Sequence, residues 1–342
     1  MALKTWGGAC QIAAVYVGTI IGAGFATGKE IVQFFSQFGF YGLFGIIISG
    51  CLFIFLGAKI MLVAMDVQAK SFEEFNAYLF GERFGLAATF IQFFMLIGVT
   101  GVMLSGTGAL FSERFHIPAN AGILLTIVIG FLVMKKGVTG LLAVNVFVVP
   151  LMIVFHLYTA SEAIAQPDFL ENLFMKETSH HTWKVWTSPF SYAAFNLALA
   201  QAVLVPLAFE IKDRQTIKKG AFLGGVVLTC LMIASHVSLI QLADVAKYDI
   251  PMAQIVEKLI PAFHFIYAFL IYGEIFTSVI GNAYGLKQQL ENHIRWPASL
   301  LFLLIFSAGF LLSQVSYGTL LGFLYPLFGM ISLLFLLLLW KK

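Results

Sequence analysis

Charged residues are scarce in this sequence: they make up 11% of its 342 residues, whereas 60% are hydrophobic. The mean hydropathy is +0.93. So little charge cannot cover a surface that faces water on all sides, so the composition excludes a soluble globular domain. We expect most of the chain to lie in lipid, and the 36 phenylalanines suit helices that face it.

Cysteine is also rare, and Cys10, Cys51 and Cys230 all fall in apolar segments. We expect small buried hydrophobic residues there, not disulfides or metal ligands. The sequence has no nucleophile elbow, phosphate loop, zinc motif or nucleic-acid-binding patch. We therefore expect neither an enzyme, nor an organic cofactor, nor a nucleic-acid partner. The first apolar run has no convincing cleavage site, so no cleavable signal is expected.

Runs of about 20 apolar residues between polar segments predict ten membrane-spanning helices. Trp296 to Trp340 contains no charge and is too long for one crossing, so it must turn once, at the polar residues 313–318. The predicted spans cover about 7–38, 40–64, 86–111, 118–134, 138–161, 186–210, 220–242 and 261–286, followed by two within 296–340. Ser71 with Glu74 predicts the cap of a short surface helix, and 243–260 a second one.

The distribution of Lys and Arg predicts the orientation. With ten spans both termini lie on one side, which collects thirteen Lys and Arg residues, whereas the other side has five. These five are Arg114, Lys176, Lys184, Lys247 and Lys258. The excess of positive charge places both termini in the cytoplasm of a bacterial cell membrane.

Four glycines fall within eleven residues of the first span: Gly18, Gly22, Gly24 and Gly28. Glycine is costly inside a helix because it loses much backbone entropy and offers no side chain for packing. We therefore expect the helix to break at 22–28. Unwound backbone at that depth occurs only where protein or a water-filled cavity satisfies it, and a broken helix of this kind is typical of a transporter binding site.

Two charges, Lys29 and Glu30, follow this break directly. Glu30 is either a gating residue or a carboxylate that caps the N-terminus of the next helical segment. Lys29 either gates the outer vestibule or pairs with Glu162. The amides of Gly22, Ala23 and Gly24 would form a cradle for a substrate carboxylate, which favours an amino acid or another small carboxylate.

In the eighth span, Glu274, Thr277 and Ser278 share one helical face, because they are three and four residues apart. The two hydroxyls either bind a ligand or bond back to carbonyls one turn earlier. An ionisable residue within a span is costly and usually functional. Glu274 is either a protonation site, a partner for a substrate amine, or a neutral acid that donates to a neighbour.

The histidines carry weaker signals. His156, His236 and His264 lie in apolar spans, where a lone histidine is more often a hydrogen-bonded packing residue than a ligand. The pair at 180–181 has no cysteine or carboxylate at a metal-binding spacing, so a metal site is not expected. Small residues in the third span, from Gly98 to Gly108, predict close helix packing.

Ten spans with a broken first helix resemble the amino acid–polyamine–organocation superfamily, which has the LeuT fold. The whole chain also resembles the YkvI-type bacterial membrane proteins, with GTIIGAGFATGKEI at 18–31 as the most specific match. The resemblance implies an all-α integral membrane fold in which five helices repeat in inverted orientation. The repeats would cover about 7–161 and 186–340 of a single domain, 1–342, and helices one and six would both be broken.

The same resemblance implies an ion site and a substrate site. Adjacent Thr and Ser on helix eight bind sodium in sodium-coupled members, together with carbonyls freed by the break in helix one. The implied ligands are the backbone oxygens of Gly18, Ile21 and Glu274 and the hydroxyls of Thr277 and Ser278. The run from Phe195 to Ala202 resembles the unwound part of helix six. The implied substrate site comprises Gly22, Ala23, Gly24, Phe25, Phe195, Asn196, Ala198 and Glu274.

From these features we expect a secondary transporter that moves a small amino-acid-like or carboxylate solute by sodium symport with alternating access. One alternative couples transport to protons through Glu274. Another is a ligand-sensing receptor subunit, since germinant receptors contain subunits of this fold. Sodium is the only metal ion expected. The expected partners are the solute and the lipid bilayer, and no oligomeric state follows from the sequence.

Overall fold

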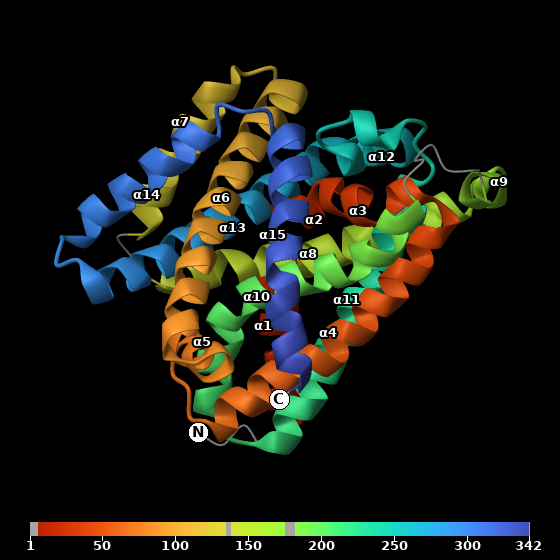
Figure 1. The fold of residues 1–342 in the computed structure, drawn as a ribbon. Helices are drawn as coiled ribbons and strands as arrows, with labels where there is room; N and C mark the ends of the chain where they lie inside the picture. Colours follow the sequence, from red (N-terminus) through yellow and green to blue (C-terminus); the bar gives the residue numbers. More distant parts are fainter. Residues whose placement is uncertain (1–5, 135–137, 175–181, 342) are drawn as a thin grey trace.

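The computed structural model describes residues 6–134, 138–174 and 182–341, and every element in these ranges is helical (Figure 1). The long helices are α1 (Trp6–Ile20), α4 (Phe40–Asp66), α6 (Glu82–Phe115), α7 (Ala119–Met134), α8 (Val138–Ile164), α10 (Thr182–Ile211), α11 (Arg214–Leu239), α13 (His264–His293), α14 (Ala298–Leu312) and α15 (Tyr317–Lys341). The short ones are α2 (Ala23–Ala26), α3 (Lys29–Phe34), α5 (Phe72–Phe80), α9 (Phe169–Phe174), α12 (Pro251–Leu259) and the 3-10 turns η1 (Ser36–Phe38), η2 (Val245–Lys247) and η3 (Pro261–Phe263).

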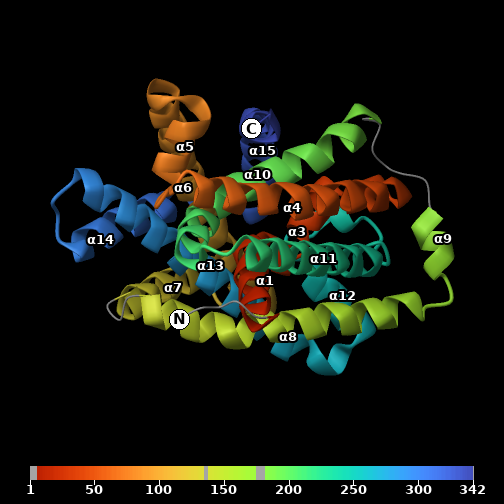
Figure 2. The ribbon, with the colours of Figure 1, turned by 90° about the horizontal axis from the view of Figure 1, so that it is seen from below.

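The long helices form two groups. In one, α1, α4, α10 and α11 pack against one another, and α15 lies along α10. Figure 2 shows α4, α10 and α11 side by side. In the other, α6 contacts α7, α13 and α14. Helix α8 contacts both α11 and α13, so it joins the two groups.

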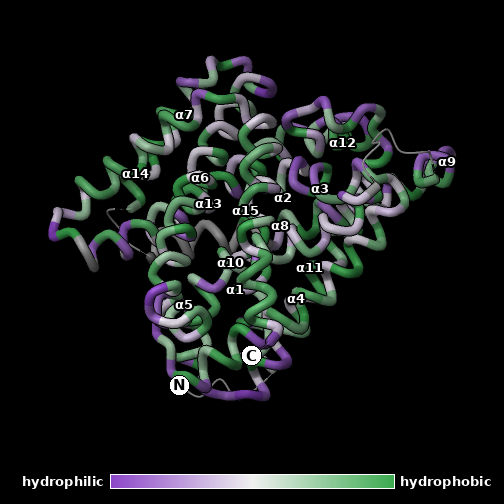
Figure 3. Tube along the Cα trace, viewed as in Figure 1, coloured by the Kyte–Doolittle hydropathy of each residue, from purple (hydrophilic) through white to green (hydrophobic). Residues whose placement is uncertain are grey.

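The surface of the long helices is apolar. Large side chains such as Phe55, Phe94 and Leu311 are 67%, 65% and 72% exposed. Figure 3 shows hydrophobic residues along the helices and hydrophilic ones gathered near their ends and in the connections. Such a surface suits lipid rather than water, because soluble monomers rarely expose apolar area on this scale.

Six described helices are long and apolar enough to cross a membrane: α4, α6, α10, α11, α13 and α15. Four shorter apolar helices of 10–17 residues lie at 7–20, 119–134, 150–164 and 298–312. These coincide with the predicted spans one, four, five and nine. The first is short because the break shortens it. The count of ten spans and the inverted repeat stay predictions.

The two short surface helices form where the sequence predicts them. Ser71 caps α5, since its hydroxyl accepts a hydrogen bond of 3.2 Å from the Glu74 amide. Helix α12 lies within the predicted 243–260 segment. The cysteines are free but exposed, not buried as expected. Cys51 lies in α4 and Cys230 in α11, whereas Cys10 of α1 lines a cavity.

The predicted break in helix one is confirmed. Helix α1 ends at Ile20, and Ile21 and Gly22 are not helical. A second interruption follows at Thr27 and Gly28, where Gly28 has a φ of 78°, a left-handed value that favours glycine. The first span is therefore built from three helical segments, α1, α2 and α3.

The predicted break in helix six is wrong. Helix α10 is continuous from Thr182 to Ile211, although Pro189 and Pro206 lie inside it. Its middle carries Ala193, Ala194 and Ala198 where a broken helix would carry glycines. Alanine has the highest helix propensity of all residues, so this segment has no local reason to unwind.

Candidate functional site

The break in helix one leaves backbone groups without helical partners. The last bond of α1 runs from the Ile21 amide to the Val17 carbonyl at 2.8 Å. Among the described residues, no backbone amide donates to the carbonyl oxygens of Gly18 to Ile21. The next such bond along the chain runs from the Ala26 amide to the Gly22 carbonyl, at 2.9 Å. The end of one helix and the start of another therefore meet at Gly22, with oxygens and amides available to a ligand.

These backbone groups face helix α13. A Cβ atom added to Gly22 would lie 3.3 Å from the Ser278 hydroxyl oxygen, so only a residue without a side chain allows this approach without displacement. Gly18, Ile21, Thr277 and Ser278 all line one cavity. The structure thus brings together four of the five residues expected to bind a cation.

The fifth, Glu274, contributes its backbone to the same region. Its carbonyl accepts the Thr277 hydroxyl at 3.0 Å, which is the bond back along the helix that the sequence left as an alternative. The Glu274 side chain is only 1% exposed and does not line the cavity. One carboxyl oxygen, Oε1, is buried and has no hydrogen-bond partner in the described part of the chain.

A cavity of about 1040 Å³ lies between α1, α6, α10 and α13. It extends from Glu30 and Tyr325 along α1 as far as Cys10, and along α13 as far as Gly285. Cys10 is near the start of α1 and Gly285 is near the end of α13. The cavity therefore runs from the break towards the end of the molecule where both chain termini lie (Figure 1).

On the opposite side of the break, the chain is closed by hydrogen bonds. The Thr27 and Tyr317 hydroxyls are 2.7 Å apart, and the Tyr267 hydroxyl donates to the Ala26 carbonyl at 3.0 Å. The Met252 amide donates to the Thr27 carbonyl at 2.9 Å, which ties α12 to the break. The connection is tight, because a Cβ atom at Gly28 would lie 2.6 Å from the Met252 side chain.

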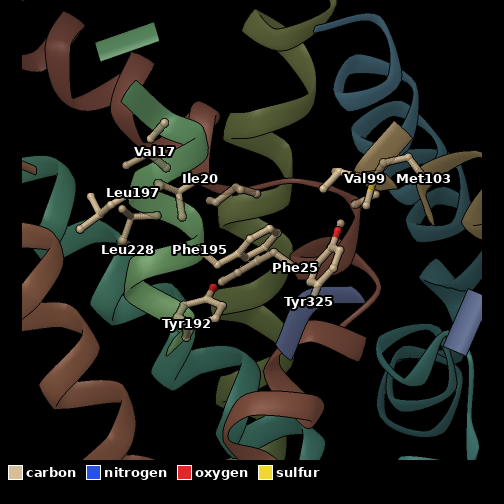
Figure 4. Packing of buried hydrophobic residues seen from close by; sticks show 14 of the residues in the cluster. Val17, Ile20, Phe25, Val99, Met103, Tyr192, Phe195, Leu197, Leu228 and Tyr325 are labelled. Atoms are coloured by element: carbon tan, nitrogen blue, oxygen red, sulfur yellow. The ribbon is translucent and has the colours of Figure 1, made fainter. Parts of the chain in front are cut away.

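Four residues of the expected substrate site line the cavity: Gly22, Gly24, Phe195 and Asn196. The Phe195 and Tyr325 rings pack against each other, with centroids 4.6 Å apart (Figure 4).

The other expected substrate residues have different surroundings. Phe25 packs against His156, with ring centroids 5.4 Å apart. The Ala198 carbonyl accepts the Gln92 side chain at 2.9 Å. Ala23 is fully buried. Like the Glu274 side chain, these three residues do not line the cavity.

Glu30 lies in the cavity wall, a position that the sequence did not indicate. Its carboxylate accepts a hydrogen bond of 3.3 Å from the Asn196 amide group, and Gly24 makes room for its other oxygen. It forms no side-chain cap for α3, whose N-cap is Gly28. A carboxylate that directly follows a broken helix within an apolar run was the available signal.

Lys29 points away from the cavity. Its Nζ donates to the Ala246 carbonyl at 2.9 Å and to the Tyr248 carbonyl at 2.6 Å. The expected alternative of a pair with Glu162 is wrong, because the ammonium group is held by carbonyls of the η2 segment instead. The carboxylates of Asp249 and Glu113 are close enough to attract the Lys29 ammonium group electrostatically. Lys29 therefore joins α3 to the segment that closes the break, a position consistent with the gating alternative.

The histidines have the surroundings of packing residues. His156 Nδ1 donates to the Met152 carbonyl at 2.9 Å, and His236 Nδ1 lies 3.0 Å from the Ser36 hydroxyl. His264 Nδ1 donates to the Pro261 carbonyl at 2.6 Å. The histidines at 180 and 181 lie outside the described residues.

Two sequence relatives match nearly the whole chain, whereas no protein-family model matches it. The membrane protein YkvI of Bacillus subtilis is 47% identical over 331 residues, which cover 96% of this chain and 94% of YkvI. The protein YyaD of the same bacterium is 24% identical over 326 residues, 93% of this chain and 91% of YyaD.

Two similar solved structures are those of membrane transporters. A manganese transporter of Eremococcus coleocola has a TM-score of 0.60 at 15% identity, over 96% of this chain and 76% of that one. Mhp1, a nucleobase-cation-symport-1 family transporter with bromovinylhydantoin bound, has a TM-score of 0.56 at 14% identity, over 92% of this chain and 74% of that one. At these identities the likeness shows the fold alone. By its sequence, the chain belongs to the YkvI family of membrane proteins.

Proposed function

We propose that this protein is a secondary transporter that moves a small amino-acid-like or carboxylate solute by sodium symport with alternating access. The observation that carries the proposal is the contact between the broken first helix and the Thr277–Ser278 pair, at the wall of a cavity large enough for such a solute. Broken helices that face a central cavity are typical of secondary transporters. The transporter fold of the similar structures supports the same class.

The ion site follows from the chemistry of its oxygens. The free carbonyls of Gly18 and Ile21 and the hydroxyls of Thr277 and Ser278 are neutral, hard ligands. Neutral oxygens suit a single positive charge, whereas calcium and magnesium sites normally include carboxylates. A sodium ion bound here would hold α1 against α13. Its loss would free α1 to move.

The arrangement of the cavity supports an inward-facing state. The cavity extends towards the end of the molecule where the chain termini lie, and the bonds at Thr27, Ala26 and Met252 close the other side. In alternating access these bonds would break when the outer side opens, while α1 closes the inner side.

The test is binding of the common amino acids to the purified protein, followed by thermal unfolding in sodium and in potassium at equal ionic strength. We expect stabilisation by a solute only in sodium. In the Thr277→Ala/Ser278→Ala variant this dependence on sodium should be lost. A matched control is Thr100→Ala/Ser238→Ala, since both hydroxyls bond back along their own helices and neither residue lines the cavity.

Sodium-dependent binding and uptake that persist in full in the Thr277→Ala/Ser278→Ala variant would rule out the ion site. Transport itself is tested separately, by accumulation of the stabilising solute in proteoliposomes with an inward sodium gradient. Binding without accumulation would refute the transporter and favour a receptor.

A second candidate couples transport to protons. The buried Oε1 of Glu274, which has no partner among the described residues, supports it, because a buried carboxyl group must be paired or neutral. In this case the stabilisation would ignore sodium and change with pH, and Glu274→Gln would abolish the pH dependence.

A further inference from the structure

Among the described residues, the wall of the central cavity carries a negative charge without a matching positive one. Of the described residues that line it, Glu30 alone carries a formal charge; the others are apolar or neutral and polar. Glu30 is 3% exposed, so little bulk water screens it. No salt bridge to it is found in the described ranges.

Neutral groups hold the carboxylate in place. Asn196 of α10 donates to Oε1 at 3.3 Å. Gly24 faces Oε2, since a Cβ atom there would lie 2.5 Å from it. The Asn196 amide group also donates to the Tyr192 carbonyl at 3.1 Å, and Tyr325 lines the same cavity as Glu30. The hydrogen bond from Asn196 favours the charged form of the carboxylate, whereas burial disfavours it, so a cationic group bound in the cavity would supply the missing countercharge.

The neighbouring cation is directed elsewhere. Lys29 precedes Glu30 in sequence, but its Nζ is held by the Ala246 and Tyr248 carbonyls on the closed side of the break. The chain thus separates two adjacent opposite charges, and leaves the negative one in the cavity wall.

Aromatic faces lie next to the carboxylate. The paired rings of Phe195 and Tyr325 both line the cavity, and Tyr325 comes within 3.2 Å of the Cβ position of Gly24. A carboxylate beside aromatic rings is an arrangement that binds organic cations, through an ion pair and a cation–π contact together.

We propose that Glu30 binds the positively charged group of the solute, and that this group is an organic ammonium. This inference rests on the proposed transport function and narrows its solute to amino acids or amines, excluding simple carboxylates. An organic cation is favoured over a transition metal, because no three His, Cys, Asp or Glu side chains come together in the described part of the chain.

The test uses a cysteine in the cavity as a probe of the field of Glu30. Leu199 lines the cavity one helical turn after Asn196. Leu199→Cys is made in a protein whose three native cysteines are replaced by alanine. Its modification rate is measured with a cationic trimethylammonium-ethyl methanethiosulfonate and with the anionic sulfonatoethyl reagent. The cationic-to-anionic rate ratio reports the local charge.

We expect Glu30→Gln to lower this ratio by roughly tenfold. Glu162→Gln is the control, since this glutamate of α8 does not line the cavity, and the ratio should stay unchanged. An unchanged ratio in Glu30→Gln would overturn the proposal. If Glu30→Gln does not fold, the Leu199→Cys protein with Glu30 intact decides: its ratio must exceed that of free cysteine in solution, and a ratio no higher than that of free cysteine would overturn the proposal.

Protection of the cysteine tests the ammonium group itself. Leucine, isoamylamine and 4-methylpentanoate share a branched aliphatic side chain. Leucine carries both an ammonium and a carboxylate group, isoamylamine only the ammonium group, and 4-methylpentanoate only the carboxylate group. We expect the amines to slow modification more than the acid, and Glu30→Gln to remove that difference. Equal protection by the acid would overturn the proposal. Because modification needs neither sodium nor transport, failure of the proposed transport function leaves this result interpretable.

Discussion

The packing of Glu30 against Gly24 allows a prediction of stability. Gly24→Ala places a methyl group 2.5 Å from the Glu30 carboxylate and 3.2 Å from the Tyr325 ring. The carboxylate must move, which breaks its 3.3 Å bond to Asn196. Loss of a hydrogen bond to a charged group costs about 1.5–3 kcal/mol, whereas alanine gains about 1 kcal/mol over glycine in a helix. We expect a net destabilisation of about 0.5–2 kcal/mol.

The assay is reversible unfolding in mixed micelles by titration with SDS, followed by tryptophan fluorescence. Gly281→Ala is the control, because Gly281 lines the same cavity and nothing lies within 4 Å of its Cβ position. This control should gain about 0.5–1 kcal/mol. In a Glu30→Ala background the clash with the carboxylate is absent, so Gly24→Ala should destabilise less than it does in the unmodified chain. Equal stabilisation by Gly24→Ala and Gly281→Ala in the unmodified chain would refute the packing argument.

Three further predictions concern access and closure. In a variant whose other two cysteines are replaced by alanine, Cys10 should react with a membrane-impermeant maleimide only from the side of the membrane on which the termini lie. Reaction from the opposite side would show that the cavity does not open towards the termini. Tyr317→Phe removes the hydroxyl bonded to Thr27 at 2.7 Å, so it should favour outer opening by about 1 kcal/mol. The ratio of outward-open to inward-open molecules should then rise roughly fivefold, which slows Cys10 labelling; unchanged labelling would show that this bond does not hold the closure. Gly28→Ala places a side chain at a φ of 78° and against Met252, so it should lower the free energy of unfolding by about 1–3 kcal/mol in the SDS assay. An unchanged free energy of unfolding would show that alanine is not strained at this position.

The position of the break in helix one was predictable because its cause is local. Gly22 and Gly28 carry conformations or contacts that other residues disfavour, and the sequence shows them directly. The same reasoning should have argued against a break in helix six, since the alanines of α10 favour a helix. There the family resemblance outweighed the local propensity, and the prediction was wrong.

The direction of side chains after the break was not predictable. The turn at Thr27 and Gly28 resets the rotation of α3, so no helical periodicity connects α1 to Glu30 or Lys29. The contact between Glu30 and Asn196 joins positions 166 residues apart. For Glu274 the helical periodicity was available, but it led to the wrong expectation that this side chain lines the cavity with Thr277 and Ser278. Residues on one wide helical face can still contact different neighbours. Only the packing of α13 decides that Thr277 and Ser278 line the cavity while the Glu274 side chain does not.

A break in one helix but not in its counterpart has a mechanical consequence. Helix α1 has 15 residues, so it is a rod about 22 Å long attached at Ile21 and Gly22. Rotation by about 15° about that pivot, similar to known rigid-body movements, would displace its N-terminal end by about 6 Å. That is about the width of a side chain, enough to admit or exclude a small solute. Helix α10 is continuous and has no such break, so we expect α1 to move on one side of the cavity while α10 keeps its position on the other.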